Sequence, residues 1–293
     1  MSAWHGIVAG LARGVKLDVP TAPFQDAVLL VEWRHWHLDD WNIMDDSDTT
    51  LAGRTALITG AARRLGRAIA LALAQQGVHV VVHHNRSADE AVSTCDAIRR
   101  LGVSAWHVQA DLADIGQAET LFERAVDEAG PIDILVNSAS TFEKETIWET
   151  SAESLEANLR LHATAPLILA RALAGQNRGG AIVNMLDTRV TVYDRQHAAY
   201  HISKRVLLTL TRMLALELAP AVAVNAVAPG LILPPAGQDE SYLKKLAHCN
   251  PLNRYGDPEQ VADAVLFLLR SRFITGQVIY VDGGYHMKGH MYD

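Results

Sequence analysis

The stretch Arg54-Thr-Ala-Leu-Ile-Thr-Gly-Ala-Ala-Arg-Arg-Leu-Gly66 decides the fold. It opens with a short apolar run that predicts a buried strand, turns at Gly60, and enters a helical pattern that continues to about Gln76. Gly60 permits a tight turn, and Gly66 lets the helix pack closely on the strand. The N-terminus of a helix in this position attracts a pyrophosphate. A strand, a glycine turn and a helix in this order therefore predict a dinucleotide site.

The same alternation of apolar runs and helical patterns continues along the chain. Further strands are predicted at residues 78–82, 103–109, 132–136, 181–186, 222–227 and 277–281. Helices are predicted at residues 87–101, 115–129, 152–174, 198–218, 239–248 and 258–270. The strands are continuous apolar runs, which is typical of a parallel sheet buried on both faces. We therefore expect an α/β fold, a single doubly wound Rossmann domain over residues 51–293 with a mostly parallel seven-stranded sheet.

Residues 1–50 do not share this pattern. They contain four of the six tryptophans and end in the acidic string Asp45-Asp-Ser-Asp48. His35 and His37 have no Cys, His or Glu at a spacing suited to a metal, so surface or packing roles are favoured and no metal site is predicted. This segment is expected to be an N-terminal extension outside the Rossmann domain.

The charge and the cysteines exclude several kinds of partner. The net charge is −7, and the first fifty residues hold eight acidic against three basic residues. The rest is close to neutral and has no basic run, so neither nucleic acid nor a membrane surface is an expected partner. No apolar run approaches about 18 residues, the length of a membrane-spanning helix. Cys95 and Cys249 lack metal-ligand spacing and are expected to be reduced thiols in a cytoplasmic protein.

The end of the second strand bears on the choice of cofactor. Sites for unphosphorylated dinucleotides usually carry an acidic residue there, about 20 residues after the glycines. This chain has His83-His-Asn-Arg-Ser87 instead, and no acid before Asp89. Arg86 can bind a 2′-phosphate through two hydrogen bonds, Ser87 can add a hydroxyl, and Arg63 can supply a second charge. NADPH is therefore the predicted cofactor, although Arg86 alone could be a solvated surface residue.

Two further segments follow strands and belong on the ligand-binding edge of such a sheet. They are Gln109-Ala-Asp-Leu112 after the third strand and Asn137-Ser-Ala-Ser140 after the fourth. Asp111 could accept a hydrogen bond from an adenine amino group or cap the following helix, and both interpretations stay open. Phe142 could form a wall of a substrate pocket or belong to the core.

Tyr200 and Lys204 are four residues apart on a predicted helix and therefore share one of its faces. A lysine ammonium beside a phenol favours the phenolate, so we expect Lys204 to lower the pKa of Tyr200 toward neutral pH. Asp187 follows the preceding strand, thirteen residues before Tyr200. An amphipathic helix with a half-buried tyrosine and a solvated lysine is the alternative, since short motifs match by chance.

Together these motifs resemble those of the short-chain dehydrogenase/reductase family. The matching residues, in the family's order, are Thr59-Gly60 with Gly66, Asp111, Asn137-Ser-Ala-Ser140, Tyr200 with Lys204, Pro229-Gly230 and Val281-Asp-Gly-Gly284. The resemblance implies catalysis by Asp187, Tyr200 and Lys204, and a homotetramer. It implies cofactor binding by Gly60, Arg63, Arg64, Leu65, Gly66, Arg86, Ser87, Asp111, Leu112, Asn137, Ala139, Lys204, Pro229 and Gly230.

Three departures from the family pattern narrow the resemblance. Arg64 stands where the family has its middle glycine, Asp187 where it has a catalytic serine, and His162 where it has a helix asparagine. The first two are similar to the pteridine reductases, whose loop reads Thr-Gly-Ala-Ala-Lys-Arg-Leu-Gly. His162 is similar to the dihydromonapterin reductase branch.

The resemblance also implies roles in binding and protonating a pterin. Asp187 would bond to Tyr200 and keep the phenol protonated, while Lys204 would set its pKa and hold the nicotinamide ribose. The substrate would be bound by Arg64, Ser140, Phe142, Asp187 and Tyr200, with Phe142 stacked on the pterin. The loop 231–240 would close over it.

The predicted function is NADPH-dependent reduction of dihydropterin to the tetrahydro form, with biopterin and dihydrofolate as further candidate substrates. The alternative is a general carbonyl or 3-oxoacyl-(acyl carrier protein) reductase, which the replacements at 64, 162 and 187 disfavour. A non-catalytic dinucleotide-sensing protein is a third possibility, and the presence of both Tyr200 and Lys204 argues against it.

Overall fold

Seven strands form one sheet whose order is β3-β2-β1-β4-β5-β6-β7. The computed structural model describes residues 50–193, 195–235 and 237–288, all within the unit Leu38–Asp293. The strands are β1 (Thr55–Ile58), β2 (His79–His84), β3 (Ala105–Gln109), β4 (Ile134–Asn137), β5 (Gly180–Met185), β6 (Val222–Pro229) and β7 (Val278–Val281). All six pairings are parallel, so the predicted Rossmann sheet is confirmed.

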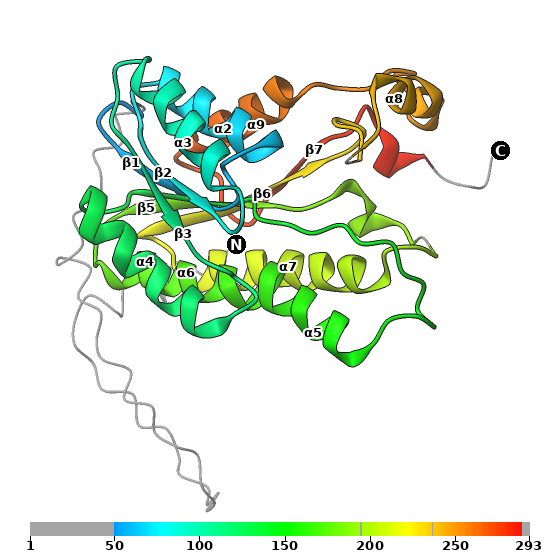
Figure 1. Ribbon diagram of the computed structural model, residues 1–293, viewed down its shortest axis with the longest axis horizontal. Helices are drawn as coiled ribbons and strands as arrows, with labels where there is room; N and C mark the ends of the chain where they lie inside the picture. Colours follow the sequence, from blue (N-terminus) through cyan, green and yellow to red (C-terminus); the bar gives the residue numbers. More distant parts are fainter. Residues whose placement is uncertain (1–49, 194, 236, 289–293) are drawn as a thin grey trace, which may run out of the picture. The chain divides into compact units, whose positions relative to one another are not determined.

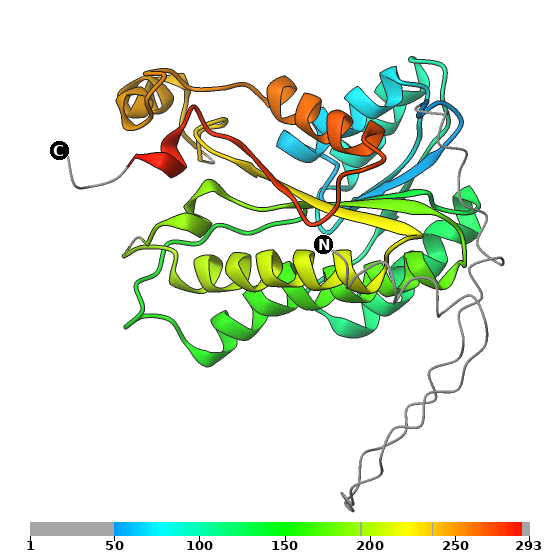
Figure 2. The same cartoon turned by 180° about the vertical axis from the view of Figure 1, so that it is seen from behind.

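Helices cover both faces of this sheet (Figures 1 and 2). One layer holds α2 (Arg64–Gln75), α3 (Ala88–Arg99) and α9 (Pro258–Arg270). The other holds α4 (Ile115–Ala129), α5 (Ala152–Leu159), α6 (Ala165–Gly175) and α7 (Ala198–Glu217), while α8 (Glu240–Leu246) lies beyond the carboxyl end of β7. The arrangement explains why the strands are apolar throughout.

The core is divided by the sheet because successive side chains of a strand point to opposite faces. On β1, Ile58 packs in the cluster that contains Ile69 of α2, whereas Leu57 packs in the cluster that contains Leu121 of α4. Leu57, Ile58 and Ile69 are essentially inaccessible to solvent. Burial on both sides fixes the strand register, and the register places the carboxyl ends of β1, β2, β4 and β5 at one edge.

One predicted helix is interrupted in the structure. The helix expected over residues 152–174 divides into α5 and α6, which are joined by a π-helical turn at Arg160–Thr164. A π turn accommodates one extra residue within a helix and often marks a functional site. Here it carries His162, one of the three positions that depart from the family pattern, and the helical span predicted over residues 152–174 is otherwise confirmed.

The remaining expectations about the chain fall partly outside the described residues. The extension 1–50, including His35 and His37, lies outside them except for Thr50. Both Cys95 and Cys249 are free thiols. Within the described part of the chain, no helix has the length and apolar character needed to cross a membrane.

Candidate active site

A cavity of about 810 Å³ lies along the carboxyl edge of the sheet. Most residues predicted for the site line it: Gly60, Arg63, Arg64, Leu65, Gly66, Arg86, Ser87, Asp111, Leu112, Ala139, Ser140, Asp187, Tyr200, Lys204, Pro229 and Gly230. We call the part around Arg63, Arg86 and Ser87 the basic end, and the part around Asp187, Tyr200 and Lys204 the tyrosine end. Asn137 and Phe142 do not line the cavity.

The glycine turn leaves no space for side chains. Gly60 has φ +65°, and a Cβ there would lie 2.8 Å from the Cα of Ala139. A Cβ on Gly66 would lie 2.3 Å from the carbonyl oxygen of Gly60. The two glycines therefore let backbone segments approach closely at the start of α2, whose N-terminus lines the cavity in a position suited to a pyrophosphate. The exposed guanidinium groups of Arg63 and Arg86 at the same end suit a phosphorylated dinucleotide.

His83 holds this turn in place, a role that the sequence did not reveal. The backbone N–H of Gly60 donates to His83 Nδ1 at 3.1 Å, so Nε2 carries the proton and donates to the carbonyl of Ala110 at 3.0 Å. The ring is 2% exposed, and burial lowers the pKa of His83 to about 4. This neutral imidazole occupies the strand end where an acid was looked for. The sequence showed that the end of this strand lacks an acidic residue, but the hydrogen bond between His83 and Gly60 is visible only in the folded protein.

The neighbouring His84 also lines the cavity at the basic end. It is 4% exposed, and its two ring nitrogens have no hydrogen-bond partner among the described residues. Ser87 is the N-cap residue of α3 but makes no side-chain capping bond there. The capping role considered for Asp111 belongs to Asp114, while Asp111 accepts from the backbone of Ala113 at 3.0 Å.

Arg64 begins α2 with φ 55°, the left-handed conformation that glycine adopts without strain. A non-glycine residue there costs roughly 1–2 kcal/mol. Its guanidinium donates to the carbonyl of Pro234 at 2.7 Å. Arg64 therefore connects the glycine turn to the loop 231–240, in addition to lining the cavity where contact with phosphates and substrate was predicted.

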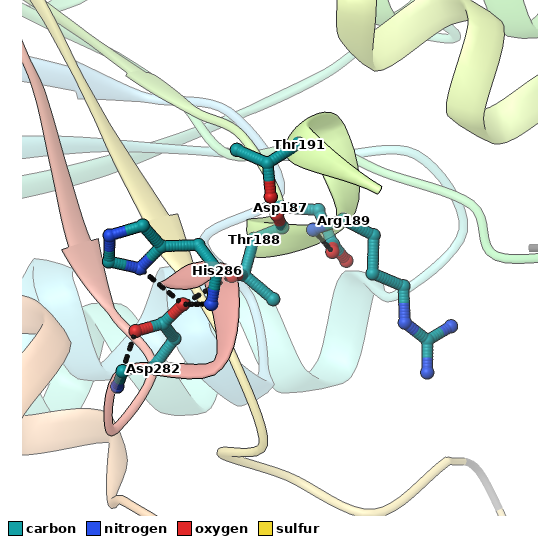
Figure 3. Close-up of polar contacts among 7 residues, drawn as sticks. Asp187, Thr188, Arg189, Thr191, Asp282 and His286 are labelled. Carbon is teal, nitrogen blue, oxygen red and sulfur yellow. Dashed lines mark hydrogen bonds and ion pairs between the residues drawn. The ribbon is translucent and has the colours of Figure 1, made fainter. Parts of the chain in front are cut away.

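At the tyrosine end, the predicted pairing of Asp187 with Tyr200 is present. Asp187 follows β5 and caps a short 3₁₀ turn, Thr188–Thr191, where its Oδ1 accepts from the backbone of Arg189 at 2.7 Å (Figure 3). The Tyr200 hydroxyl donates to Asp187 Oδ2 at 2.9 Å. A carboxylate that accepts at both oxygens orients the phenol and keeps its proton in place.

The expected effect of Lys204 on Tyr200 was wrong. Burial, followed by the charge and the hydrogen bond of Asp187, raises the pKa of Tyr200 well above its usual value. Lys204 Nζ donates to the carbonyl of Met185 at 2.6 Å and lies 5.8 Å from the Tyr200 ring centroid. Burial lowers the pKa of Lys204 to about 8, against the opposing charge of Asp187. The shared helix face is correct, but the hydrogen bond of the ammonium goes to the Met185 carbonyl.

His162 joins α7 to the segment after β4. Ser203 donates to the Tyr200 carbonyl at 2.8 Å, so its oxygen accepts from His162 Nδ1, also at 2.8 Å. His162 Nε2 is then an acceptor, 3.0 Å from the Ser140 hydroxyl. Burial, followed by the charge of Lys204, lowers the pKa of His162 well below its usual value. The imidazole is therefore neutral and connects Ser140 with α7.

Phe142 and Asn137, the two predicted residues that do not line the cavity, contact residues next to it. Phe142 is 44% exposed and stacks on His197 with ring centroids 3.8 Å apart, while the Tyr200 ring meets it edge-on at 4.8 Å. Asn137 donates to the side chain of Asn184 at 2.8 Å, which braces β4 against β5 beneath the cavity.

Comparison with known proteins gives consistent matches over this domain. The profile described as Enoyl-(Acyl carrier protein) reductase matches residues 60–286. L-xylulose reductase from Mesocricetus auratus is 36% identical over 251 residues, which cover 81% of this chain and 98% of that protein. The 3-oxoacyl-(acyl-carrier-protein) reductase FabG of Staphylococcus aureus is 33% identical over 252 residues, which cover 80% and 98% respectively.

Similar solved structures share this fold and contain NADP. FolM alternative dihydrofolate reductase 1 from Brucella canis, crystallised with NADP, has a TM-score of 0.77 and 36% identity, covering 83% of this chain and 98% of that one. An angucycline C-6 ketoreductase, LanV, with bound NADP, has a TM-score of 0.76 and 30% identity, covering 82% and 98%. The dehydrogenase/reductase resemblance is thus found in both sequence and structure.

Proposed function

The chain belongs to the short-chain dehydrogenase/reductase family, a family of oxidoreductases, and on this basis we propose that it reduces dihydropterins to tetrahydropterins with NADPH. The observation that supports a pterin as the substrate is the hydrogen bond from Tyr200 to Asp187. Reduction of a pterin C=N bond needs a proton for the ring nitrogen alongside the hydride. A phenol that Asp187 keeps protonated can supply that proton.

The residues at the basic end fit NADPH. The turn at Gly60 and Gly66 would receive the pyrophosphate, and Arg63, Arg86 and Ser87 the 2′-phosphate. NADPH supplies the hydride when bound. Similar structures crystallised with NADP support this choice of cofactor.

The residues at the tyrosine end would orient the substrate and deliver the proton. Tyr200 would donate from its hydroxyl, and the ionised Asp187 would hold the phenol at the donating position. Lys204, which is 3% exposed, would fix the nicotinamide ribose through its ammonium. Arg64 and Ser140 would bind the substrate edge, and Phe142 could stack on its face after leaving His197.

The range of pterins is part of the proposal. Similarity to FolM alternative dihydrofolate reductase supports dihydrofolate as a further substrate, and biopterin is included as another candidate. The proposal also includes a homotetramer in the cytoplasm, in keeping with the family resemblance and the two free thiols.

A carbonyl or 3-oxoacyl reductase is the second candidate. L-xylulose reductase and FabG among the relatives favour it. Carbonyl reduction uses a neutral hydroxyl beside the tyrosine to polarise the substrate oxygen, and a carboxylate at position 187 would repel the charge that develops there. For this reason the pterin is preferred.

A panel assay separates the two candidates. NADPH oxidation would be followed with 7,8-dihydropterin, biopterin, dihydrofolate, L-xylulose and an acetoacetyl thioester, with Tyr200→Phe as the matched control. We expect turnover with the reduced pterins, lost in the control. Turnover with the sugar or the thioester alone would contradict the proposal and favour the second candidate.

A further inference from the structure

Asp282, directly after β7, is a buried carboxylate in contact with the loop that carries Asp187. Its side chain is 1% exposed. Oδ1 accepts from the backbone of Gly284 at 2.9 Å, and Oδ2 accepts from the backbone and Nδ1 of His286, both at 2.9 Å, and from the Thr188 hydroxyl (Figure 3). Burial opposes its ionisation, but the bonds from Thr188 and His286 outweigh this and hold the pKa of Asp282 below its usual value.

The partners of Asp282 are of two kinds. Gly284 and His286 lie two and four residues away, and their bonds close the turn at the end of the chain. Thr188 lies 94 residues away in the sequence. Among these four bonds, its hydroxyl alone ties the buried carboxylate to the segment after β5.

The bond from Thr188 to Asp282 matters because Thr188 directly follows Asp187. Asp187 is extended, with φ −145° and ψ 145°, so the two neighbouring side chains project to opposite sides. Asp187 points to Tyr200, while Thr188, 4% exposed, points to Asp282. A bond that holds Thr188 therefore also holds the adjacent backbone of Asp187, whose carboxylate orients the Tyr200 phenol.

The segment after β5 is buried at its start and exposed only farther on, so the Thr188 bond lies where the chain leaves the sheet. The strand β5 ends at Met185, and the chain then runs through exposed residues, such as Tyr193 at 87% exposure, before α7 begins at Ala198. Groups that act in chemistry must be held within about 0.5 Å of their working position. Leu186 and Val190 are buried against Leu207, Ala226 and Ala228, so apolar packing already holds this segment, and the bond from Thr188 adds a directional polar contact beside Asp187.

We propose that Thr188, anchored on the buried carboxylate of Asp282, is a positioning residue that keeps Asp187 within hydrogen-bond reach of Tyr200. This proposal rests on the proposed function, in which Asp187 keeps the Tyr200 phenol protonated. It assigns to the end of the chain a part in the chemistry at the tyrosine end.

Two matched variants test it, because each removes one bond to the same oxygen of Asp282. Thr188→Val removes the hydroxyl and keeps the shape. His286→Phe removes the Nδ1 bond but keeps a ring to stack on Tyr280, now 4.1 Å away between centroids. We expect kcat for dihydropterin to fall roughly tenfold or more in Thr188→Val, since small misplacements reduce rates strongly, and to change little in His286→Phe. Thr188→Ser should restore kcat, and NADPH affinity should stay constant throughout.

A purely structural bond would not reproduce two further readouts. In the background of Asp187→Asn, the valine substitution should cause no additional loss of kcat, because its effect passes through Asp187. The alkaline limb of the kcat profile in Thr188→Val should also move to lower pH, because the charge of Asp187 raises the pKa of Tyr200.

Equal effects of Thr188→Val and His286→Phe on kcat, or loss of thermal stability with kcat and its pH profile unchanged, would overturn the proposal. An additive loss in the double variant would do the same. If wild-type protein reduces another substrate but no pterin, the proposed function fails separately. The same comparison on that substrate then decides the role of Thr188.

Discussion

At the basic end of the cavity, exposed arginines lie beside bare backbone and two buried histidines, His83 and His84, whereas at the tyrosine end the tyrosine and lysine are almost completely buried. Arg63 and Arg86 are exposed, while Tyr200 and Lys204 are 7% and 3% exposed. Exposed guanidinium groups keep their charge and attract a phosphate. Buried groups have shifted pKa values, as those of Tyr200 and Lys204 are here. The first arrangement suits binding and the second suits proton transfer.

This contrast leads to a general expectation for variants. Changes at the basic end should alter cofactor affinity and leave kcat nearly constant. Changes at Asp187 and Tyr200 should alter kcat and leave cofactor affinity nearly constant, whereas Lys204, which would hold the nicotinamide ribose, should affect both.

The largest effect is expected at Tyr200. Replacing it in Tyr200→Phe removes the proton donor but keeps the ring that packs against Phe142. General acid catalysis contributes about a hundredfold to ten-thousandfold, so kcat should fall by about a thousandfold. Steady-state turnover and a separate NADPH binding titration would measure the two quantities. A variant that keeps wild-type kcat would show that the tyrosine end does not move the proton.

Arg86 tests the basic end. Removing a charge-assisted hydrogen-bond donor costs about 1.5–3 kcal/mol, so Arg86→Ala should weaken NADPH binding by roughly tenfold to a hundredfold. Binding of NADH should hardly change, because NADH lacks the 2′-phosphate. Fluorescence titration with both nucleotides measures the difference. Equal weakening of the two would remove Arg86 from recognition of the phosphate.

The lowered pKa of Lys204 predicts a pH dependence at the tyrosine end. Above the pKa of about 8 the ammonium loses its proton, and its fraction falls about tenfold for each further pH unit. If the ammonium holds the nicotinamide ribose, kcat/KM should decline as the pH rises through this value. A profile recorded from about pH 6 to pH 10 would reveal the limb, and Lys204→Met should lack it. A flat profile would contradict a role for the charged form.

The smallest effect concerns stability at the basic end. His83 has a pKa of about 4 in the folded protein against an ordinary 6.5, so between these values the unfolded chain binds more protons. Its contribution to stability is therefore complete above about pH 6.5 and decreases as the pH falls toward 4. Between about pH 7 and pH 5.5 the free energy of unfolding should drop by about 1 kcal/mol through this group.

Denaturant unfolding at the two pH values would measure the drop, with His83→Phe as the comparison. The variant lacks the titrating ring, so its stability should depend less on pH over the same interval. A variant with the same pH dependence as wild type would mean that His83 titrates normally. Its hydrogen bond from Gly60 would then not hold the neutral form.

The sequence predicted the sheet well because its strands are continuous apolar runs separated by helical patterns. It also placed Asp187 near Tyr200, because both lie at the carboxyl edge and the resemblance set their roles. The π turn at His162 was missed, since an extra residue in a helix leaves the periodic pattern on either side intact. A resemblance therefore identified that position but could not give its conformation.

The pKa of Tyr200 was misjudged for a different reason. A spacing of four residues fixes which helix face two side chains share, but the flexible stem of a lysine decides where its ammonium lies. Here it bonds to the Met185 carbonyl. The pairing of His83 with Gly60 and of Thr188 with Asp282 spans 23 and 94 residues, and such contacts follow only from the folded chain.

The central claim is that Asp187 directs the site toward a pterin. Its most direct test is the ratio of kcat/KM for 7,8-dihydropterin to kcat/KM for an acetoacetyl thioester, measured with NADPH for wild type and for Asp187→Ser. We expect a ratio well above one in wild type and a fall of about a hundredfold in the variant. Wild-type protein that oxidises NADPH with the thioester but not with dihydropterin would contradict it.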